Sequence, residues 1–182
     1  GSTFKLVSAM AGMYSGKVDG NSRMPKSCTG AYRFGNRVAH CWYSKGHGRL
    51  DLVGAVQKSC NVYFYQLGLL LGDETINEVA RMVGLGRKTG IDLPIERQGY
   101  LSGEKAHNKR FARRIKESEG WAWTRGLLLD LAIGQQQVLT PLQLARMVGT
   151  LAHGRTLYRP FLAKEMRTRD GLVVEQTTPH VQ

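Results

Sequence analysis

A serine and a lysine three residues apart, Ser2 and Lys5, have the types and the spacing for nucleophilic catalysis. A serine hydroxyl is a poor nucleophile until a neighbouring group takes its proton. On a helix, this spacing places Lys5 over the same face as Ser2. A dry pocket lowers the pKa of a lysine amine, which can then act as the base, and a helix N-terminus favours a developing oxyanion. Alone, the S-x-x-K pattern is common and indicates only a solvated lysine in a first turn.

A second candidate site is the tripeptide Ser59-Cys60-Asn61, which lies between two predicted apolar helices. That placement turns both polar side chains toward a cleft. There Ser59 could relay a proton to a leaving amine, and Asn61 could hold Lys5 and a substrate amide. Serine and asparagine also populate ordinary turns, so the tripeptide indicates chemistry only in combination with the first motif.

Four further side chains have metal-ligand chemistry: Cys28, Cys41, His47 and Cys60. Three thiolates and one imidazole form a tetrahedral set that suits structural zinc. A metal would also order a region that is poor in apolar residues. The alternative is a Cys28–Cys41 disulfide with Cys60 free and buried. His40 is a rival ligand, His47 between two glycines could simply satisfy a loop, and the spacings match no standard zinc finger. The sequence therefore leaves three outcomes open: zinc, the disulfide, or neither.

Helices must position these groups, and apolar periodicity predicts five of them. They cover residues 3–14, 51–58, 62–71, 73–84 and 140–154. Asp51 and Asp73 are the expected caps of the second and fourth helices. Thr140 and Gln143 form a capping box at the start of the last one.

The other segments carry turn and strand signals. Residues 15–50 and 85–126 are rich in Gly, polar and charged residues, which predicts irregular structure. Residues 155–174 contain strand signals, with a hairpin expected about Asp170-Gly171. The whole chain of 182 residues, 42% of them hydrophobic, has the composition of one globular domain. It contains no signal peptide and no apolar stretch of the roughly 18 to 20 residues that cross a bilayer.

The formal net charge is +12, and basic residues concentrate over residues 105–116. Such a charge suits nucleic acid, an anionic membrane surface or an acidic substrate. Because no motif for DNA or RNA accompanies it, we interpret the basic cluster as a solvated face and expect no nucleic-acid partner. A basic face beside anionic phospholipid fits as well.

The Ser2–Lys5 pair and the Ser59-Cys60-Asn61 tripeptide together indicate a function more specifically than either motif does alone. S-x-x-K, an S-D-N element and K-T-G form the motif set of penicillin-binding proteins and class A β-lactamases. The sequence resembles the class B penicillin-binding proteins, and within them the elongation type, over nearly its whole length. The residues that carry the resemblance are Gly1-Ser2-Thr3-Phe4-Lys5, Cys41-Trp42, Gly46-His47-Gly48, Ser59-Cys60-Asn61-Val62-Tyr63-Phe64-Tyr65, Gly84-Leu85-Gly86, Thr89-Gly90-Ile91-Asp92-Leu93-Pro94 with Glu96, Ile133-Gly134-Gln135 and Thr140-Pro141-Leu142-Gln143.

The resemblance implies an α/β (α+β) transpeptidase fold shared with serine β-lactamases, in which helices flank a five-stranded antiparallel sheet. Residues 1–182 are then a single, partial transpeptidase domain, mostly its helical lobe, with much of the sheet missing. Lys88-Thr89-Gly90 looks like the third motif but leads into Ile-Asp-Leu-Pro, so we interpret it as a decoy. We expect a segment truncated before the catalytic K-T-G strand and inactive alone. Gln136 stands where the family usually has Gly.

The resemblance also implies a function: a peptidoglycan D,D-transpeptidase that cross-links cell wall during elongation and so supports cell shape. D-Ala-D-Ala stem peptides and β-lactam antibiotics would acylate Ser2, with Lys5 as base and Ser59 and Asn61 assisting. No cofactor is needed for catalysis, so zinc would be structural. The implied protein partners are a glycosyltransferase and elongation-complex membrane proteins. The implied location is the periplasmic face of the inner membrane, with an N-terminal anchor absent from this chain.

Two related functions stay open at this point. A serine β-lactamase shares Ser2 and Lys5, but no deacylating glutamate motif is visible. A penicillin-sensing receptor domain would be acylated in the same way and would signal instead of cross-linking. Residues inside this domain do not separate a receptor from a transpeptidase.

Overall fold

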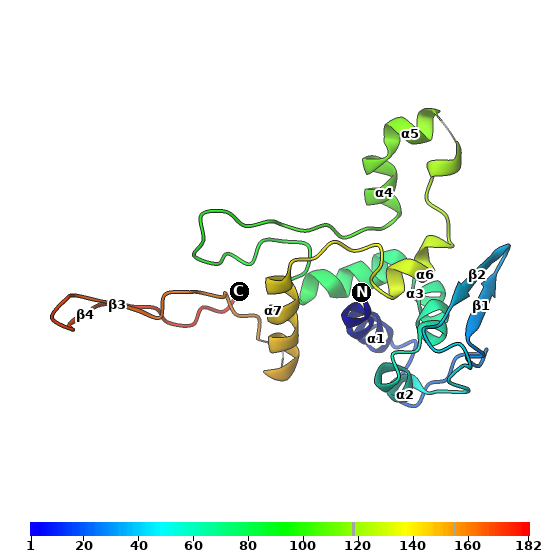
Figure 1. Cartoon of the computed structure of the whole chain (residues 1–182), viewed down its shortest axis with the longest axis horizontal. Coiled ribbons are helices and arrows are strands. Elements are labelled where there is room, and N and C mark those ends of the chain that lie inside the picture. The colour runs from blue at the N-terminus through cyan, green and yellow to red at the C-terminus, as the bar shows by residue number, and fades with distance from the viewer. Residues whose placement is uncertain (118, 155) are drawn as a thin grey trace. The chain divides into compact units, whose positions relative to one another are not determined.

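The computed structural model describes all residues except 118 and 155 (Figure 1). They form two compact units. The first unit comprises Gly1–Ala80 and Leu101–Gln137, and the second comprises Arg81–Tyr100 and Val138–Gln182. The single domain expected over residues 1–182 stays a prediction.

The first helix of the chain begins as a 3-10 turn, η1 (Ser2–Phe4), and continues as α1 (Lys5–Tyr14). Phe4, Val7 and Ala11 lie on one face and are at most 1% exposed. Burial of a Phe or Val side chain contributes about 1.5–3 kcal/mol, which fixes this helix in the unit. The helix predicted over residues 3–14 is therefore confirmed.

Two helices with a tight break between them follow: α2 (Leu52–Gln57), and α3 (Asn61–Met82), of which residues 61–80 belong to the first unit. Asp51 caps α2 as predicted, because its carboxylate accepts a hydrogen bond of 2.8 Å from the Gly54 N–H. Gly72 has φ +79° and interrupts α3 where the sequence predicts a break. The expected role of Asp73 differs, since its carboxylate accepts from the N–H of Glu104 at 2.7 Å.

Residues 15–50 contain a hairpin that the sequence reading missed. Strands β1 (Ala31–Phe34) and β2 (Arg37–His40) pair antiparallel, with Phe34 opposite Arg37. The two residues between them are a Gly with φ +56° and an Asn, a turn type that suits the twist of paired strands. The strands are short and bury a single residue, Ala39, so the alternation that marks a strand was weak.

Residues 85–126 are also more ordered than predicted. They include α4 (Glu104–Arg110), α5 (Ala112–Glu117) and η2 (Glu119–Trp121). No side chain of α4 or α5 is buried, so neither helix has the apolar stripe that periodicity detects. Ring contacts of 4.7 to 5.5 Å among His107, Phe111, Trp121 and Trp123 hold this segment together. The basic cluster lies on its exposed surface.

Helix α6 (Leu127–Ala132) was not predicted either, and it packs tightly on α3 in the first unit. A Cβ atom at Gly68 would lie 2.6 Å from the Cβ of Ala132 and 2.9 Å from the carbonyl oxygen of Leu128. The glycine therefore allows the two helices to approach. This contact fixes the loop that follows α6.

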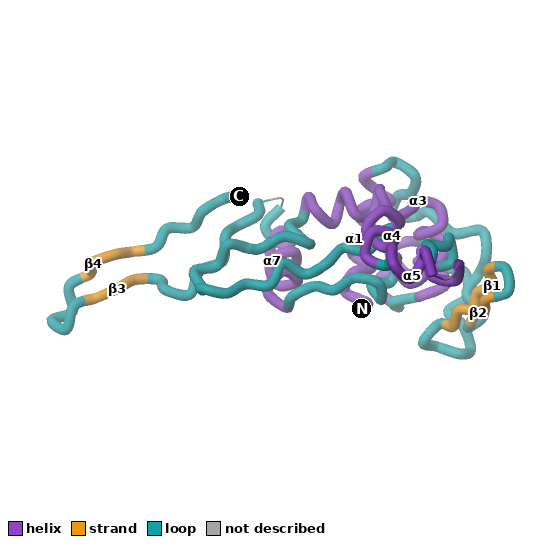
Figure 2. The backbone as a smooth tube through the Cα atoms, turned by 90° about the horizontal axis from the view of Figure 1, so that it is seen from above, coloured by secondary structure: helices purple, strands orange, loops and turns teal. Residues whose placement is uncertain are grey.

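The second unit contains α7 (Pro141–Ala152) and a hairpin of β3 (Glu165–Arg167) and β4 (Val173–Gln176). Thr140 and Gln143 form the predicted capping box. The turn between β3 and β4 includes Gly171 with φ +86°, which confirms the predicted hairpin (Figure 2). Within the described residues the sheets are these two hairpins, so the described part of the chain is mainly helical.

Candidate active site

The amine of Lys5 is the centre of a polar cluster in the first unit. Its Nζ lies 3.2 Å from Ser2 Oγ, 2.9 Å from Ser59 Oγ, 2.9 Å from the Ser59 carbonyl oxygen and 2.6 Å from Asn61 Oδ1. The Lys5 residue is only 3% exposed. The structure thus brings together all four residues that the two sequence motifs predicted, although 54 residues separate Lys5 from Ser59.

The number of protons on Nζ decides what this cluster can do. An ammonium has three protons to donate and no lone pair, so it cannot serve four oxygen partners fully. A neutral amine has two protons and one lone pair. It can donate to the Ser59 carbonyl and to Asn61 while it accepts a proton from the Ser2 hydroxyl. The geometry therefore suits a lysine that acts as a base toward Ser2.

The surroundings of Lys5 favour that neutral form. Burial lowers the pKa of Lys5 below its ordinary value, and Cys41 and Cys60 partly oppose this shift. The Phe64 ring, whose centroid lies 6.0 Å from Nζ, weakly favours the ammonium form by cation–π attraction, so burial is what lowers the pKa of Lys5. A larger fraction of free amine is therefore available at neutral pH than for an exposed lysine.

The turn before α3 places Ser59 and Asn61 beside the amine. Ser59 has φ +49°, the one non-glycine residue with positive φ in the described part of the chain. This left-handed residue reverses the chain between α2 and α3. Asn61 starts α3, and its amide nitrogen donates to the His40 carbonyl at 3.2 Å, which aims its Oδ1 at Lys5.

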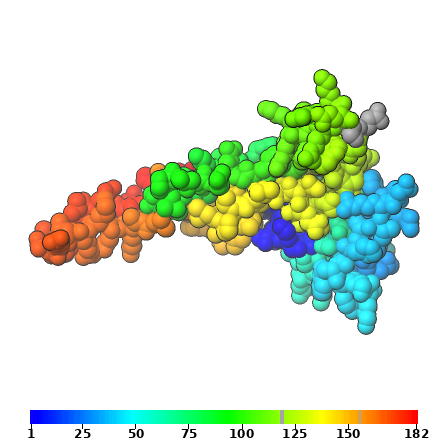
Figure 3. Space-filling model, turned by 45° about the horizontal axis from the view of Figure 1, so that its top comes forward, coloured from blue at the N-terminus to red at the C-terminus, as the bar shows by residue number. Residues whose placement is uncertain are grey.

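A cleft of about 340 Å³ opens beside Ser2. Its lining residues are Gly1, Ser2, Trp42, Ser59, Asn61, Ile133 and Gln135. Ser2 itself is exposed, and the first residues of the chain, in dark blue in Figure 3, reach the surface among neighbouring segments. A substrate carbonyl can therefore reach the Ser2 hydroxyl, while the Lys5 amine stays shielded from water.

Gly134 seats the start of the first helix. It has φ +78°, and a Cβ atom there would lie 2.5 Å from both the Gly1 carbonyl oxygen and the Phe4 Cβ. The loop after α6 can therefore press against the residues that flank Ser2 only because residue 134 is glycine. Ile133-Gly134-Gln135 is one of the motifs that carry the family resemblance, but the sequence predicted this positioning role for none of the three residues.

The three cysteines and His47 form a second cluster in the same unit. One ligand atom from each of the four residues lies within 4.8 Å of the others. The Nδ1 of His47 is 3.6 Å from Cys28 Sγ and 3.5 Å from Cys41 Sγ. The edge between nitrogen and sulfur in a tetrahedral zinc site is roughly 3.5 Å for bonds of about 2.0 and 2.3 Å. The four donor atoms therefore fit zinc in type, and the two nitrogen–sulfur distances of His47 fit it in spacing.

Local backbone geometry assembles that cluster. Cys28 and Gly48 exchange backbone hydrogen bonds of 2.8 and 2.9 Å, which bring His47 back over the first cysteine. A Cβ atom at Gly46 would lie 2.3 Å from the Cys28 carbonyl oxygen. The exposed ring of the rival ligand His40 is outside the cluster. All three thiols are free in this structure, and no disulfide joins the described cysteines.

The pKa values of Cys41, His47 and Cys60 shift in different directions. Burial raises the pKa of the Cys60 thiol to about 12. Burial acts in the same direction on Cys41, but backbone hydrogen bonds from Tyr43 and from the start of α3 lower its pKa overall. Burial, together with the nearby lysines, lowers the pKa of His47, which keeps its imidazole neutral as a metal ligand must be.

The whole chain, residues 1–182, matches the model of the penicillin-binding protein transpeptidase domain. The chain belongs to this family. It is 34% identical over 158 residues to the peptidoglycan D,D-transpeptidase MrdA of Acinetobacter baumannii, covering 85% of this chain and 22% of that protein. It is 33% identical over 165 residues to the stage V sporulation protein D of Bacillus subtilis, covering 91% of this chain and 23% of that protein.

Solved structures of family members are similar to this chain in fold. PBP2 of Helicobacter pylori, in its complex with MreC, has a TM-score of 0.80 at 32% identity, covering 90% of this chain and 29% of that one. PBP2 of Pseudomonas aeruginosa in complex with WCK 5153 has a TM-score of 0.77 at 33% identity, covering 98% of this chain and 38% of that one. These likenesses confirm the transpeptidase fold and group the chain with PBP2-like class B members. The chain spans about a quarter of the length of its curated relatives.

Lys88-Thr89-Gly90 lies in the second unit of the chain and is held there by backbone contacts. The N–H groups of Thr89 and Gly90 donate to the Glu96 carboxylate at 2.6 and 2.9 Å. The Thr89 carbonyl accepts from Arg146 at 3.3 Å, and Thr89 is fully buried. These contacts support the interpretation of this K-T-G as a structural segment.

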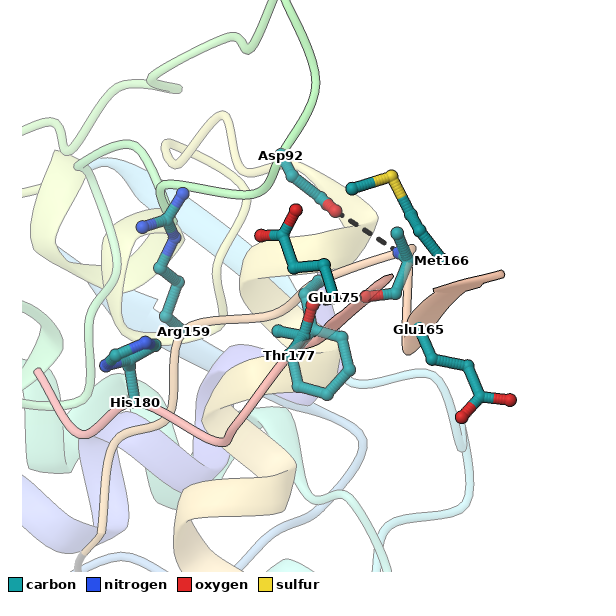
Figure 4. Close-up of a pocket in the computed structure, with 9 residues that line it drawn as sticks. Asp92, Arg159, Glu165, Met166, Glu175, Thr177 and His180 are labelled. Carbon is teal, nitrogen blue, oxygen red and sulfur yellow. Dashed lines mark hydrogen bonds between the residues drawn. The ribbon is translucent and has the colours of Figure 1, made fainter. Parts of the chain in front are cut away.

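Another pocket, of about 280 Å³, lies in the second unit (Figure 4). Asp92 at its rim accepts from the N–H groups of Leu162 and Ala163 at 2.8 and 3.2 Å. The Thr177 hydroxyl donates to the Ala163 carbonyl. Asp92 and Thr177 are therefore engaged in hydrogen bonds that hold the backbone around this pocket. The cleft at Ser2, which a nucleophile lines, is the better candidate for acyl-transfer chemistry.

Proposed function

We propose that the protein is a serine-type peptidoglycan D,D-transpeptidase that is acylated at Ser2. One observation carries the proposal: the buried amine of Lys5 lies within 3.2 Å of Ser2 Oγ and also contacts Ser59 and Asn61. The family and the relative named as a D,D-transpeptidase support the same reaction class.

The reaction follows from the proton positions. Ser2 Oγ attacks the carbonyl carbon of the penultimate D-alanine while Lys5 Nζ takes the hydroxyl proton. As the peptide bond breaks, the proton passes through Ser59 Oγ, 2.9 Å from Nζ, to the departing amine of the terminal D-alanine. A second stem-peptide amine then attacks the ester carbonyl: the new amide bond forms, the ester C–O bond breaks, and the proton that the amine loses passes through Ser59 Oγ and Lys5 Nζ to Ser2 Oγ. A β-lactam carbonyl enters the same cleft and leaves an acyl group on Ser2.

We also propose that Cys28, Cys41, His47 and Cys60 hold a structural zinc ion. The zinc ion would only cross-link the four side chains, because four protein ligands leave no open position for a substrate. Cys60 lies between Ser59 and Asn61, so the cross-link would hold the turn that faces Lys5. Catalysis itself would need no cofactor.

The partners and the location are part of the same proposal. The related PBP2 solved with MreC and the related structure of a peptidoglycan synthase complex support assembly with elongation-complex membrane proteins and a glycosyltransferase. The proposed location is the periplasmic face of the cell membrane. Among the described helices, none has the length and apolarity to cross a bilayer.

The test is covalent labelling of the full-length protein with a fluorescent penicillin, followed by peptide mass mapping. The adduct should lie on the peptide that contains Ser2, and Ser2→Ala should abolish it. Thr3→Ala, which removes the next exposed hydroxyl in the same turn, should keep it. Label retained in Ser2→Ala would refute the assignment of the nucleophile.

A further inference from the structure

Trp42 makes an unusual contact with the turn that carries Ser59. Its indole Nε1–H points at two backbone oxygens, the carbonyls of Lys58 at 3.0 Å and of Ser59 at 3.1 Å. The Ser59 carbonyl also accepts from Lys5 Nζ at 2.9 Å. The indole and the candidate base therefore share one acceptor atom.

That shared acceptor lies in the most constrained part of the site. Ser59 has φ +49°, a left-handed conformation that costs a non-glycine residue about 1–2 kcal/mol. A donor that holds the carbonyls on both sides of the Ser59 N–Cα bond opposes relaxation of this turn. If the turn relaxed, Ser59 Oγ and Asn61 Oδ1 would leave their positions around Nζ.

The ring of Trp42 has a second relation to the site. It is 64% exposed and lines the cleft beside Ser2. Its centroid lies 5.7 Å from that of Tyr43 and 5.1 Å from that of His47, so neighbouring rings hold it. A large, rigid and exposed ring at the wall of a binding cleft provides apolar contact at a small cost in side-chain entropy.

We propose that Trp42 positions the Ser59 turn through its N–H and contacts the apolar part of the acyl donor through its ring. The inference rests on the proposed function, because it assigns a role in acylation of Ser2. The two parts of Trp42 then affect different measurable constants. Loss of the N–H lowers the acylation rate constant, and loss of the ring raises the dissociation constant of the noncovalent complex.

The test compares Trp42→Phe with Trp42→Ala in the full-length protein, by stopped-flow acylation with a fluorescent penicillin. Trp42→Phe keeps a ring but has no donor for the two carbonyls, so its acylation rate constant should fall about fivefold to tenfold, the value of one ordinary hydrogen bond. Its dissociation constant should stay within about threefold. Trp42→Ala should also weaken noncovalent binding by about tenfold. Trp121→Phe is the matched control and should change neither constant.

A second measurement covers the case in which a Trp42 variant fails to fold. Trp42, Trp121 and Trp123 are the three tryptophans of the chain. A Trp121→Phe/Trp123→Phe protein therefore reports on Trp42 alone, and acylation by a nonfluorescent penicillin should shift or quench its emission. Unchanged emission, or an unchanged rate constant in folded Trp42→Phe, would overturn the inference. If the unaltered protein were not labelled at Ser2 at all, that result would instead refute the proposed function.

Discussion

The amide oxygen of Asn61 lies 2.6 Å from Lys5 Nζ, the shortest of the four contacts that this amine makes. A neutral amide at this position accepts a hydrogen bond from the amine without adding a charge. A carboxylate there would stabilise the ammonium form and raise the pKa of Lys5. The identity of residue 61 is therefore a direct control on the base.

Asn61→Asp should slow acylation at neutral pH and move its pH profile upward. The free amine is the active form and is present above the pKa of Lys5, which burial lowers in the native protein. The added carboxylate reverses part of that shift, so a higher pH is needed for the same fraction of free amine. Acylation rates measured from pH 6 to 10 test this. Asn21→Asp adds the same charge in an exposed loop and should leave the profile unchanged.

Gly134→Ala should displace the residues around Ser2. The new Cβ would lie 2.5 Å from the Gly1 carbonyl oxygen and the Phe4 Cβ, at a φ of +78°. We expect a loss of about 2–4 kcal/mol in the free energy of unfolding, from backbone strain and overpacking together, and acylation at least tenfold slower. Gly149→Ala is the matched control, because nothing lies within 4 Å of its Cβ position on α7. Equal behaviour of the two variants would contradict the proposed contact.

Lys88→Ala should leave acylation within about twofold of the unaltered protein if Lys88-Thr89-Gly90 is structural. Lys88 is exposed, and the contacts of this segment come from its backbone. Glu96→Ala removes the acceptor of two of those N–H groups and should lower the free energy of unfolding by about 1–2 kcal/mol. Denaturant melts and penicillin labelling check both variants. A large loss of labelling in Lys88→Ala alone would restore this K-T-G as a catalytic motif.

The predictable parts of this structure are those with local causes. Ser2 and Lys5 meet because they are three positions apart on one helix, and Asp51 and Thr140 cap the helices that directly follow them. The meeting of Lys5 with Asn61 spans 56 residues and was expected only because the motifs resemble a family.

The missed elements have no local apolar pattern. Helices α4 and α5 bury no side chain, and the β1–β2 hairpin buries only Ala39. The role of Gly134 depends on a neighbour 133 residues away, the carbonyl of Gly1, which no reading of nearby residues reveals. The Gly-Asn turn after Phe34 was a usable signal for the hairpin.

Arg37 should contribute to stability by joining the hairpin to α6. Its guanidinium donates to both carboxylate oxygens of Asp130 at 2.7 and 2.8 Å and to the Gly126 carbonyl at 3.0 Å. The Arg37 side chain is 43% exposed, so solvent screens the pair and Arg37→Ala should cost only about 1 kcal/mol. Arg33→Ala, at an exposed position of β1, should cost less. A double-mutant cycle with Asp130→Ala isolates the coupling, and a coupling of zero would remove this role.

Zinc removal should loosen the turn that carries Ser59 as well as the segment of residues 15–50 that precedes α2. Purified protein should contain one zinc per chain, and Cys41→Ser should lose it, because Cys41 faces His47 at 3.5 Å. Chelation should lower the melting temperature and slow acylation of Ser2. Ser44→Ala, an exposed change in the same loop, should keep the metal. The alternative Cys28–Cys41 disulfide predicts the opposite chemistry: no zinc, one titratable thiol on Cys60 after unfolding without reductant, and a melting temperature lowered by reductant but not by chelator.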